Sequence, residues 1–249
     1  MMKRVFAANW KMNHGPAEAA EFVRHFVAGF APASDRTVIL FPSALALAVA
    51  REGLRARPEI KVGVQNIHWE DRGAFTGETS APIARAAGAD YVLVGHSERR
   101  HVFGETDEEA GKKVAAGIRA GLTPVLCVGE TAGERERGET AAVVLRQLRS
   151  GLAQSGRTGV AACLVAYEPV WAIGTGKTAT PRDAAEVHVA IRAELRALGG
   201  DGAVNVPILY GGSVNQENAA TLLAADEVGG LLVGGASLDA GRWCAIART

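Results

Sequence analysis

A glutamate followed by an apolar loop, within residues 167–178, is the first feature of this chain that could carry chemistry. Glu168 follows an apolar run of strand length, residues 160–166, and Pro169 biases it away from helical backbone. The loop behind it contains Trp171 and Ile173, which is unusual for a connection that faces water. A carboxylate beneath an apolar cover can act as a general base in a site that excludes water. A solvated glutamate beside a surface turn would have the same local sequence, so the remaining residues must decide.

Other polar side chains also stand where apolar runs end. Asn9 and Lys11 follow the first run, Gln65 ends the third, and His96 follows the fourth, just before an expected helix. Near a helix N-terminus the dipole disfavours imidazolium, so His96 could stay neutral and donate a hydrogen bond to a substrate carbonyl. Lys11 would complement a bound dianion or a developing oxyanion. Taken singly, His96 could equally be a structural histidine at a strand end, and Lys11 could be a solvated surface lysine.

Glycines gather after the last two apolar runs, in Gly211-Gly212-Ser213 and Gly234-Gly235. Glycine lets the backbone approach an anion closely, and a following helix N-terminus supplies oriented N–H donors. Two such turns at neighbouring strand ends predict a phosphate-binding cup.

Strand and helix patterns alternate about eight times along the 249 residues, without a break in composition. Strands buried on both faces and separated by helices indicate a parallel sheet. We therefore expect an α/β fold, a single (β/α)₈ barrel over residues 1–249 with a closed parallel sheet of eight strands. A doubly wound open sheet is the alternative. In a barrel all the polar residues above would meet at the C-terminal ends of the strands.

Composition excludes several classes of protein. Formal net charge is +0, which gives no electrostatic reason to expect nucleic acid or membrane partners. No apolar segment approaches the ~18 residues of a membrane span, and the N-terminus lacks a signal-peptide pattern. The three cysteines have no metal-binding or disulfide spacing. We expect a cytoplasmic protein with no metal.

The chain closely resembles the triosephosphate isomerase family in motifs that follow the family's order along nearly its whole length. The matching stretches are Asn9-Trp10-Lys11-Met12-Asn13, Gln65-Asn66, Gly73-Ala74-Phe75-Thr76-Gly77-Glu78, residues 94–100, residues 126–130, residues 166–178, residues 210–214 and residues 232–238. The resemblance implies a TIM barrel that interconverts dihydroxyacetone phosphate and glyceraldehyde 3-phosphate without a cofactor.

The resemblance also implies roles for individual residues. Glu168 matches the base that moves a proton between adjacent carbons, and His96 matches the neutral group that polarises the carbonyl. Lys11 matches a residue that binds substrate and stabilises charge in catalysis. The remaining matches are substrate-binding positions: Asn9, Gly174, Ser213, Gly234 and Gly235. Glu98 matches a supporting residue whose role the sequence does not give.

Two loops acquire expected functions in the same way. Residues 169–179 resemble a mobile active-site lid, and residues 66–80 resemble a dimerisation loop that brings Thr76 near the partner's site. The resemblance thus implies a homodimer whose ligand is a small triose phosphate. The alternatives are another phosphate-binding barrel enzyme acting on small sugar phosphates, or a barrel kept as a binding scaffold. The first would need a metal site, a Schiff-base lysine or another acid/base pair; the second would predict loss of His96, Glu168 or the apolar loop.

Overall fold

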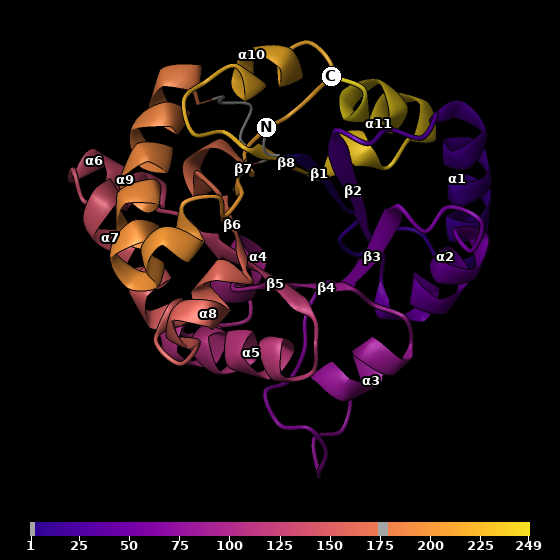
Figure 1. Ribbon diagram of the computed structural model, residues 1–249, viewed down its shortest axis with the longest axis horizontal. Coiled ribbons are helices and arrows are strands. Elements are labelled where there is room, and N and C mark those ends of the chain that lie inside the picture. The colour runs from indigo at the N-terminus through magenta and orange to yellow at the C-terminus, as the bar shows by residue number, and fades with distance from the viewer. Residues whose placement is uncertain (1–2, 174–178) are drawn as a thin grey trace.

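Eight parallel strands close into a barrel in the computed structural model, which describes residues 3–173 and 179–249 (Figure 1). The strands pair in chain order, and β1 closes the sheet by pairing with β8 as well as β2. The expected (β/α)₈ fold is confirmed, and the open-sheet alternative is wrong. The strands are β1 (Arg4–Asn9), β2 (Arg36–Phe41), β3 (Ile60–Val64), β4 (Tyr91–Val94), β5 (Thr123–Val128), β6 (Leu164–Tyr167), β7 (Ile208–Tyr210) and β8 (Gly230–Val233).

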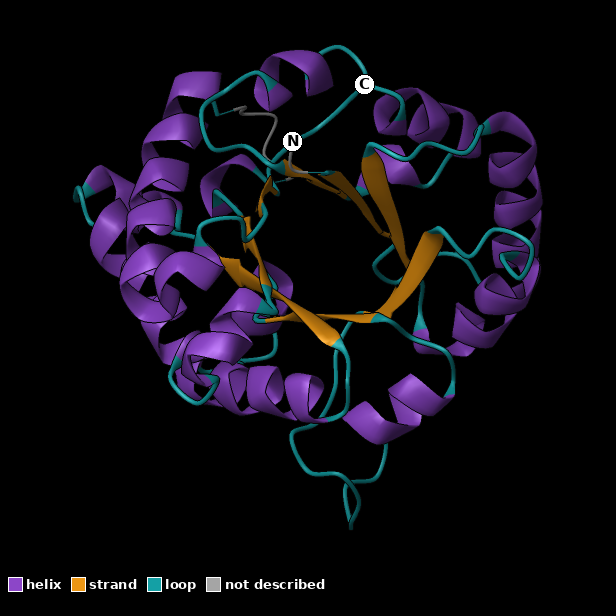
Figure 2. Ribbon diagram, in the orientation of Figure 1, coloured by secondary structure: helices purple, strands orange, loops and turns teal. Residues whose placement is uncertain are grey.

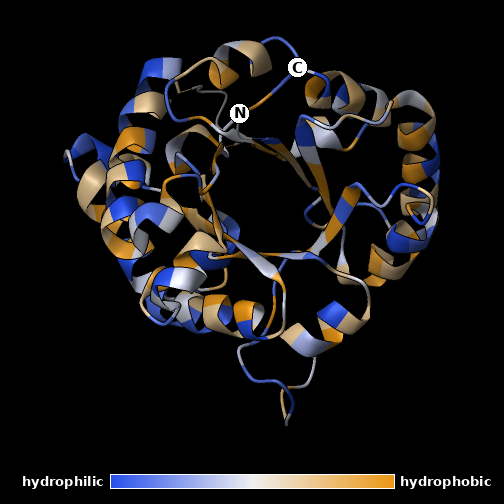
Figure 3. Cartoon of the chain, in the orientation of Figure 1, coloured by the Kyte–Doolittle hydropathy of each residue, from blue (hydrophilic) through white to orange (hydrophobic). Residues whose placement is uncertain are grey.

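Helices surround the barrel as an outer ring (Figure 2). Each long helix carries hydrophobic residues on one side and hydrophilic residues on the other, as an element between a core and water requires (Figure 3). The helices are α1 (Pro16–Gly29), α2 (Leu47–Gly53), α3 (Ala81–Ala86), α4 (Ser97–His101), α5 (Asp107–Arg119), α6 (Ala132–Glu136), α7 (Thr140–Leu152), α8 (Gly156–Ala161), α9 (Pro181–Gly199), α10 (Ala219–Leu223) and α11 (Ala240–Ala247). Short 3₁₀ turns are η1 (Ala44–Ala46), η2 (Val170–Ala172), η3 (Gly200–Ala203) and η4 (Gly235–Ser237).

Strand alternation divides the buried side chains into two cores. In β1, Val5 and Ala7 belong to the cluster inside the barrel, while Phe6 and Ala8 belong to the cluster between strands and helices. Successive strand residues point to opposite faces, so every strand must be apolar on both. This requirement explains the continuous apolar runs in the sequence.

Side-chain caps set several helix starts that the sequence predicts. Thr106 and Glu109 form a reciprocal capping box at α5, and Thr180 and Asp183 form another at α9. Both predicted helix starts are confirmed. The second cap fixes the chain immediately after the loop that follows Glu168.

Two sequence-based boundaries are wrong. The apolar run 160–166 is not one strand, because residues up to Ala161 lie in α8 and β6 begins at Leu164. The pattern of residues 134–153 predicts one helix, but the chain forms two, α6 and α7, because Gly138 between them has φ 73° and interrupts the helix. The first break lies inside a continuous apolar run, and the second lies in the polar stretch 134–140, where apolar periodicity gives no signal.

The segment between β3 and α3, which includes residues 66–80, extends away from the barrel (Figure 1). Its base is an aromatic stack in which the His68 ring lies 4.2 Å from Trp69 and 4.1 Å from Phe75, centroid to centroid. Lys112 of α5 lies over the Trp69 ring. The base of the segment is therefore held together by packing between aromatic side chains of the segment itself.

Within the described ranges, 3–173 and 179–249, no helix is both long enough and apolar enough to cross a membrane.

His188 of α9 is fully buried. Its Nδ1 donates a hydrogen bond to Glu227 O at 3.1 Å, and its ring packs edge-on against Tyr167. Burial lowers the pKa of His188 from 6.5 to about 4. The folded chain therefore keeps this ring neutral over a pH range in which the unfolded chain protonates it.

We predict that His188 makes the free energy of unfolding decrease as the pH is lowered. Its contribution is complete above pH 6.5 and is lost as pH falls toward 4, because only the unfolded state gains the proton. Between pH 7.5 and pH 5 the loss should be about 2 kcal/mol. Urea unfolding of the unsubstituted chain and of His188→Gln at both pH values measures it. An equal pH dependence in the two proteins would contradict the assignment.

Candidate active site

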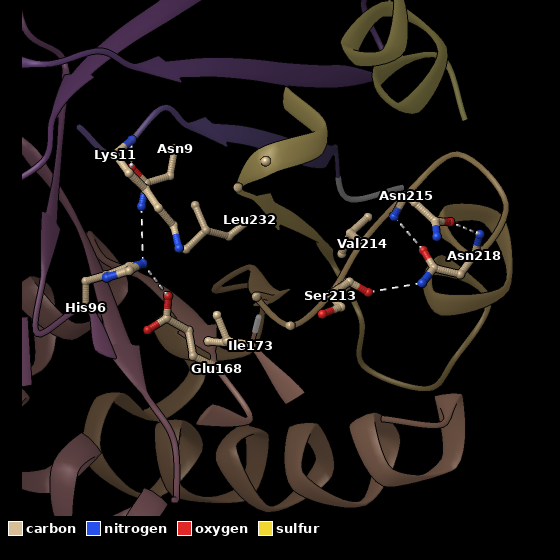
Figure 4. A pocket seen from close by; sticks show the side chains of 14 residues that line it. Asn9, Lys11, His96, Glu168, Ile173, Ser213, Val214, Asn215, Asn218 and Leu232 are labelled. Atoms are coloured by element: carbon tan, nitrogen blue, oxygen red, sulfur yellow. Dashed lines mark hydrogen bonds and ion pairs between the residues drawn. The ribbon is translucent and has the colours of Figure 1, made fainter. Parts of the chain in front are cut away.

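A cavity of about 280 Å³ opens at the C-terminal ends of the strands (Figure 4). The predicted residues Asn9, Lys11, His96, Glu168 and Ser213 all border it, although they come from four different strand ends. Among the described residues that line it, Lys11 is the only cation. The other lining residues are Ile173, Gly211, Gly212, Val214, Asn215, Asn218, Leu232, Gly234 and Gly235.

Glu168 stands one residue beyond β6 and is only 2% exposed. Its backbone N–H donates to Val128 O of the neighbouring strand. Its Oε2 accepts a hydrogen bond from Ser97 N at 2.8 Å, and its Oε1 lies 3.0 Å from His96 Nε2. Burying a carboxylate is costly unless polar partners compensate it, and these two groups are its partners at the bottom of the cavity.

The His96 ring is held in one tautomer by the backbone of α4. Glu98 N donates to Nδ1 at 3.2 Å, so Nδ1 carries a lone pair and the proton of the neutral ring is on Nε2. Nε2 faces the Glu168 carboxylate, which can only accept, so in this tautomer the ring presents a donor to the cavity (Figure 4). Asn9 Nδ2 is also a donor; it lies 3.2 Å from the same nitrogen and would bond to it only in the other tautomer.

Lys11 follows β1 in a strained conformation. Its φ is 53°, in the left-handed region, which costs a side-chain-bearing residue about 1–2 kcal/mol. Both sides of the residue are fixed: its N–H donates to Asn9 Oδ1, and Gln65 Nε2 donates to its carbonyl oxygen at 2.8 Å. Its ammonium forms an ion pair with Glu98 at 2.6 Å. The strained backbone of Lys11 is thus fixed on both sides, and this fixes the direction of its side chain, which carries the only cation in the described cavity wall.

The glycine turns form the opposite side of the cavity. A Cβ at Gly211 would lie 2.9 Å from Glu168 Cγ, and one at Gly234 would lie 3.3 Å from Lys11 Cε. Ser213 donates its hydroxyl proton to Ala172 O at 2.6 Å, which joins the turn after β7 to the loop after β6. The backbone of both turns therefore borders the cavity at close range.

The start of the loop after Glu168 is anchored on a buried carboxylate. Glu130 accepts hydrogen bonds from Tyr167 OH at 3.1 Å and Trp171 Nε1 at 2.9 Å. Arg135 stacks on the Trp171 ring and pairs with Asp183, just past the end of the loop. Burial and the Glu130 charge raise the pKa of Tyr167, which stays protonated and donates. Of the predicted residues, Gly174 lies outside the described ones, as do residues 174–178 of the predicted lid.

Sequence reasoning missed Ser97, whose backbone N–H binds Glu168, and left the role of Glu98 open. The backbone N–H of Glu98 fixes His96, and its carboxylate pairs with Lys11. The signal was present, because these residues directly follow His96. A backbone donor leaves no trace in residue type, however, and the Lys11 contact joins residues 87 positions apart.

Other reactive groups nearby do not extend the site. Burial, reinforced by the Glu168 charge, raises the pKa of Cys127 well above its ordinary value, so its thiol is no nucleophile at neutral pH. No group of three or more His, Cys, Asp or Glu side chains in residues 3–173 and 179–249 could hold a metal. The chemistry of this cavity is that of a carboxylate, a neutral imidazole and an ammonium.

A closed parallel barrel with its cavity at the C-terminal ends of the strands is the architecture of (β/α)₈-barrel enzymes, whose active sites lie at this end. The model of the family described as triosephosphate isomerase matches residues 4–249. The chain belongs to the triosephosphate isomerase family.

Individual relatives are similar over their whole length. The triosephosphate isomerase of Bdellovibrio bacteriovorus is 50% identical over 248 residues, 99% of each chain. That of Aquifex aeolicus is 46% identical over 242 residues, 96% of each chain. A crystal structure of triosephosphate isomerase from Bartonella henselae matches with a TM-score of 0.88 at 38% identity, covering 98% of each chain.

A substitution at Gly129 can show how strongly the neighbouring strand end determines the position of Glu168. A Cβ there would lie 1.8 Å from Glu168 O, and Gln147 bonds both the N–H and the carbonyl oxygen of Gly129. We predict that Gly129→Ala displaces Glu168 and lowers kcat about 100-fold, as a misplacement near 1 Å does. Steady-state kinetics measures the loss.

Gly133→Ala is the matched control, because the nearest atom to its Cβ is the movable end of Arg137. If Gly129→Ala does not fold, Gln147→Met removes the same support without a clash. Unchanged kcat in the folded variant would contradict the role of this contact.

Proposed function

We infer that this protein is an intramolecular aldose–ketose isomerase that interconverts dihydroxyacetone phosphate and D-glyceraldehyde 3-phosphate through an enediolate. The family match across residues 4–249 supports the reaction. The observation that carries the mechanism is the 3.0 Å contact between Glu168 and a neutral His96 inside the cavity. The alternative, another phosphate-binding barrel enzyme acting on small sugar phosphates, is not favoured, because the triosephosphate isomerase family model matches nearly the whole chain, residues 4–249.

Glu168 is the proposed base. It removes a proton from the carbon beside the substrate carbonyl and returns it to the neighbouring carbon, so no electron acceptor is needed. His96 donates its Nε2 proton toward the carbonyl oxygen and moves protons between the two oxygens. Lys11 offsets the negative charge that develops on the enediolate, and Asn9 contacts the substrate beside it.

The phosphate group is proposed to bind at the two glycine turns. Backbone N–H groups at Ser213, Gly234 and Gly235 are the donors we assign, and the borders of the cavity support this assignment. Gly174 is assigned to the same role from the sequence alone. Backbone donors suit a dianion because they bring positive partial charge without the flexibility of a long side chain.

Residues 169–179 are proposed to form a mobile lid over the bound substrate. The anchoring of Trp171 by Glu130, and of Asp183 by Arg135, supports fixed ends for such a segment. Its apolar side chains would exclude water from the enediolate, which solvent protons and phosphate elimination would otherwise destroy.

The reaction is tested by a coupled assay of triose phosphate interconversion without added metal or nucleotide. We predict that Glu168→Gln folds, binds inorganic phosphate almost normally and loses several orders of magnitude in kcat, because an amide cannot accept the proton. Glu52→Gln, an exposed position on α2, is the control. A folded parent protein without activity would refute the function, and full activity of Glu168→Gln would refute only the base.

We also propose that the protein acts as a cytoplasmic homodimer. Most of the large exposed hydrophobic residues among the described ones lie in the segments that follow the first four strands, which are neighbours in the barrel; one of these residues lies in α3. A second copy would bury these side chains, and residues 66–80 would be the principal contact, with Thr76 near the partner's site. Three free, buried cysteines suit a reducing compartment. The exposed residues in question are Met12, Leu45, Phe75, Ile83, Val102 and Phe103.

Val102→Glu should weaken this dimer. Val102 is 72% exposed, and a buried charge without a partner should raise the dimer dissociation constant about 100-fold or more. Sedimentation velocity across a concentration series measures the change. Val189→Glu, at a 50% exposed valine on α9, is the matched control. Equal association of both variants would contradict the proposed face.

A further inference from the structure

Asn218, at the start of α10, borders the cavity but has no assigned role. We propose that Asn218 is a positioning residue for the substrate phosphate, acting through the backbone of residues 213–215. This inference rests on the proposed function, because it concerns the same phosphate-binding turn.

The Asn218 carboxamide bonds to the turn with both of its polar atoms. Its Nδ2 donates to Ser213 O at 3.0 Å, and its Oδ1 accepts from Asn215 N at 2.8 Å. These two backbone groups flank Val214, so the side chain pairs with this segment as the edge of a neighbouring strand would. One carboxamide therefore fixes the orientation of two successive peptide groups.

Asn218 is itself held in place from the other side. Asn215 Oδ1 accepts from Asn218 N at 3.0 Å and from Glu217 N at 2.9 Å. Asn218 O accepts from Leu222 N within the first turn of α10. The two asparagines thus form a closed set of hydrogen bonds, and the carboxamide reaches Ser213 already oriented (Figure 4).

The direction of the Ser213 carbonyl group matters for an anion. Figure 4 shows Asn218 on the side of Ser213 away from His96 and Glu168. The carbonyl is bound toward Asn218, and because the peptide is planar and trans, the N–H of Val214 points the opposite way. A carbonyl free to turn toward the cavity would bring its negative end against a phosphate. The Asn218 amide removes that orientation.

The Ser213 side chain cannot replace this bond, because its hydroxyl donates to Ala172 O at 2.6 Å. Asn218 and Ala172 therefore fix Ser213 from two directions, one through its carbonyl and one through its hydroxyl group. Loss of Asn218 leaves the peptide between Ser213 and Val214 free to rotate while the rest of the cavity is unchanged.

The test compares Asn218→Leu and Asn218→Asp with Asn205→Leu, a control at an exposed asparagine before β7. Leucine removes both hydrogen bonds with a side chain that branches at the same atom, whereas aspartate keeps an acceptor for Asn215 N but cannot donate to Ser213 O. KM and kcat for glyceraldehyde 3-phosphate and the inhibition constant of inorganic phosphate are measured, with thermal unfolding as the check on folding.

We expect KM and the phosphate inhibition constant to rise together about tenfold in both Asn218 variants, with kcat changed less than threefold, because only binding shared by substrate and transition state is lost. Unchanged phosphate inhibition, a fall in kcat alone, or an effect of aspartate without one of leucine would each overturn the inference. If Asn218→Leu does not fold, the isosteric aspartate variant decides. An inactive parent protein would instead refute the proposed function.

Discussion

The hydrogen bond from Glu98 N to His96 Nδ1 determines what chemistry the cavity can perform. It leaves the imidazole proton on Nε2, and Nε2 is the atom that faces Glu168. The Glu168 carboxylate and the imidazole N–H are therefore complementary rather than competing groups. Glu98 also pairs with Lys11, so the residue that fixes the tautomer also directs the cation. The proposed acid/base chemistry depends on this short turn at the start of α4.

Barrel closure supplies the other condition. Residues separated by up to 226 positions, from Asn9 to Gly235, border one cavity because all eight strands end at the same mouth. The strand ends approach so closely that Gly129 has no room for a side chain beside Glu168. This closeness explains how a nearly buried carboxylate obtains a hydrogen bond from the backbone of the β4 loop, at Ser97.

Much of the site is held by backbone groups that polar side chains orient. Gln65 fixes the carbonyl of strained Lys11, Gln147 fixes Gly129, and Asn218 fixes Ser213. Neutral carboxamides can donate and accept at once, and they add no charge beside an anionic ligand. The cavity thus keeps Lys11 as the one cation of its described wall. Such residues are difficult to recognise in a sequence, because their partners are distant backbone atoms.

The sequence by itself determined the barrel and the positions of Asn9, Lys11, His96 and Glu168, because apolar runs that are buried on both faces mark the strands and their ends. It could not determine where the run 160–166 changes from helix to strand, since both elements there are buried and apolar. Only the tertiary structure decided the tautomer of His96, the partner of Lys11 and the burial of His188. The physical reason is that periodicity records which face of an element is buried. Hydrogen bonds between elements depend instead on how closed strands bring distant backbone groups within about 3 Å.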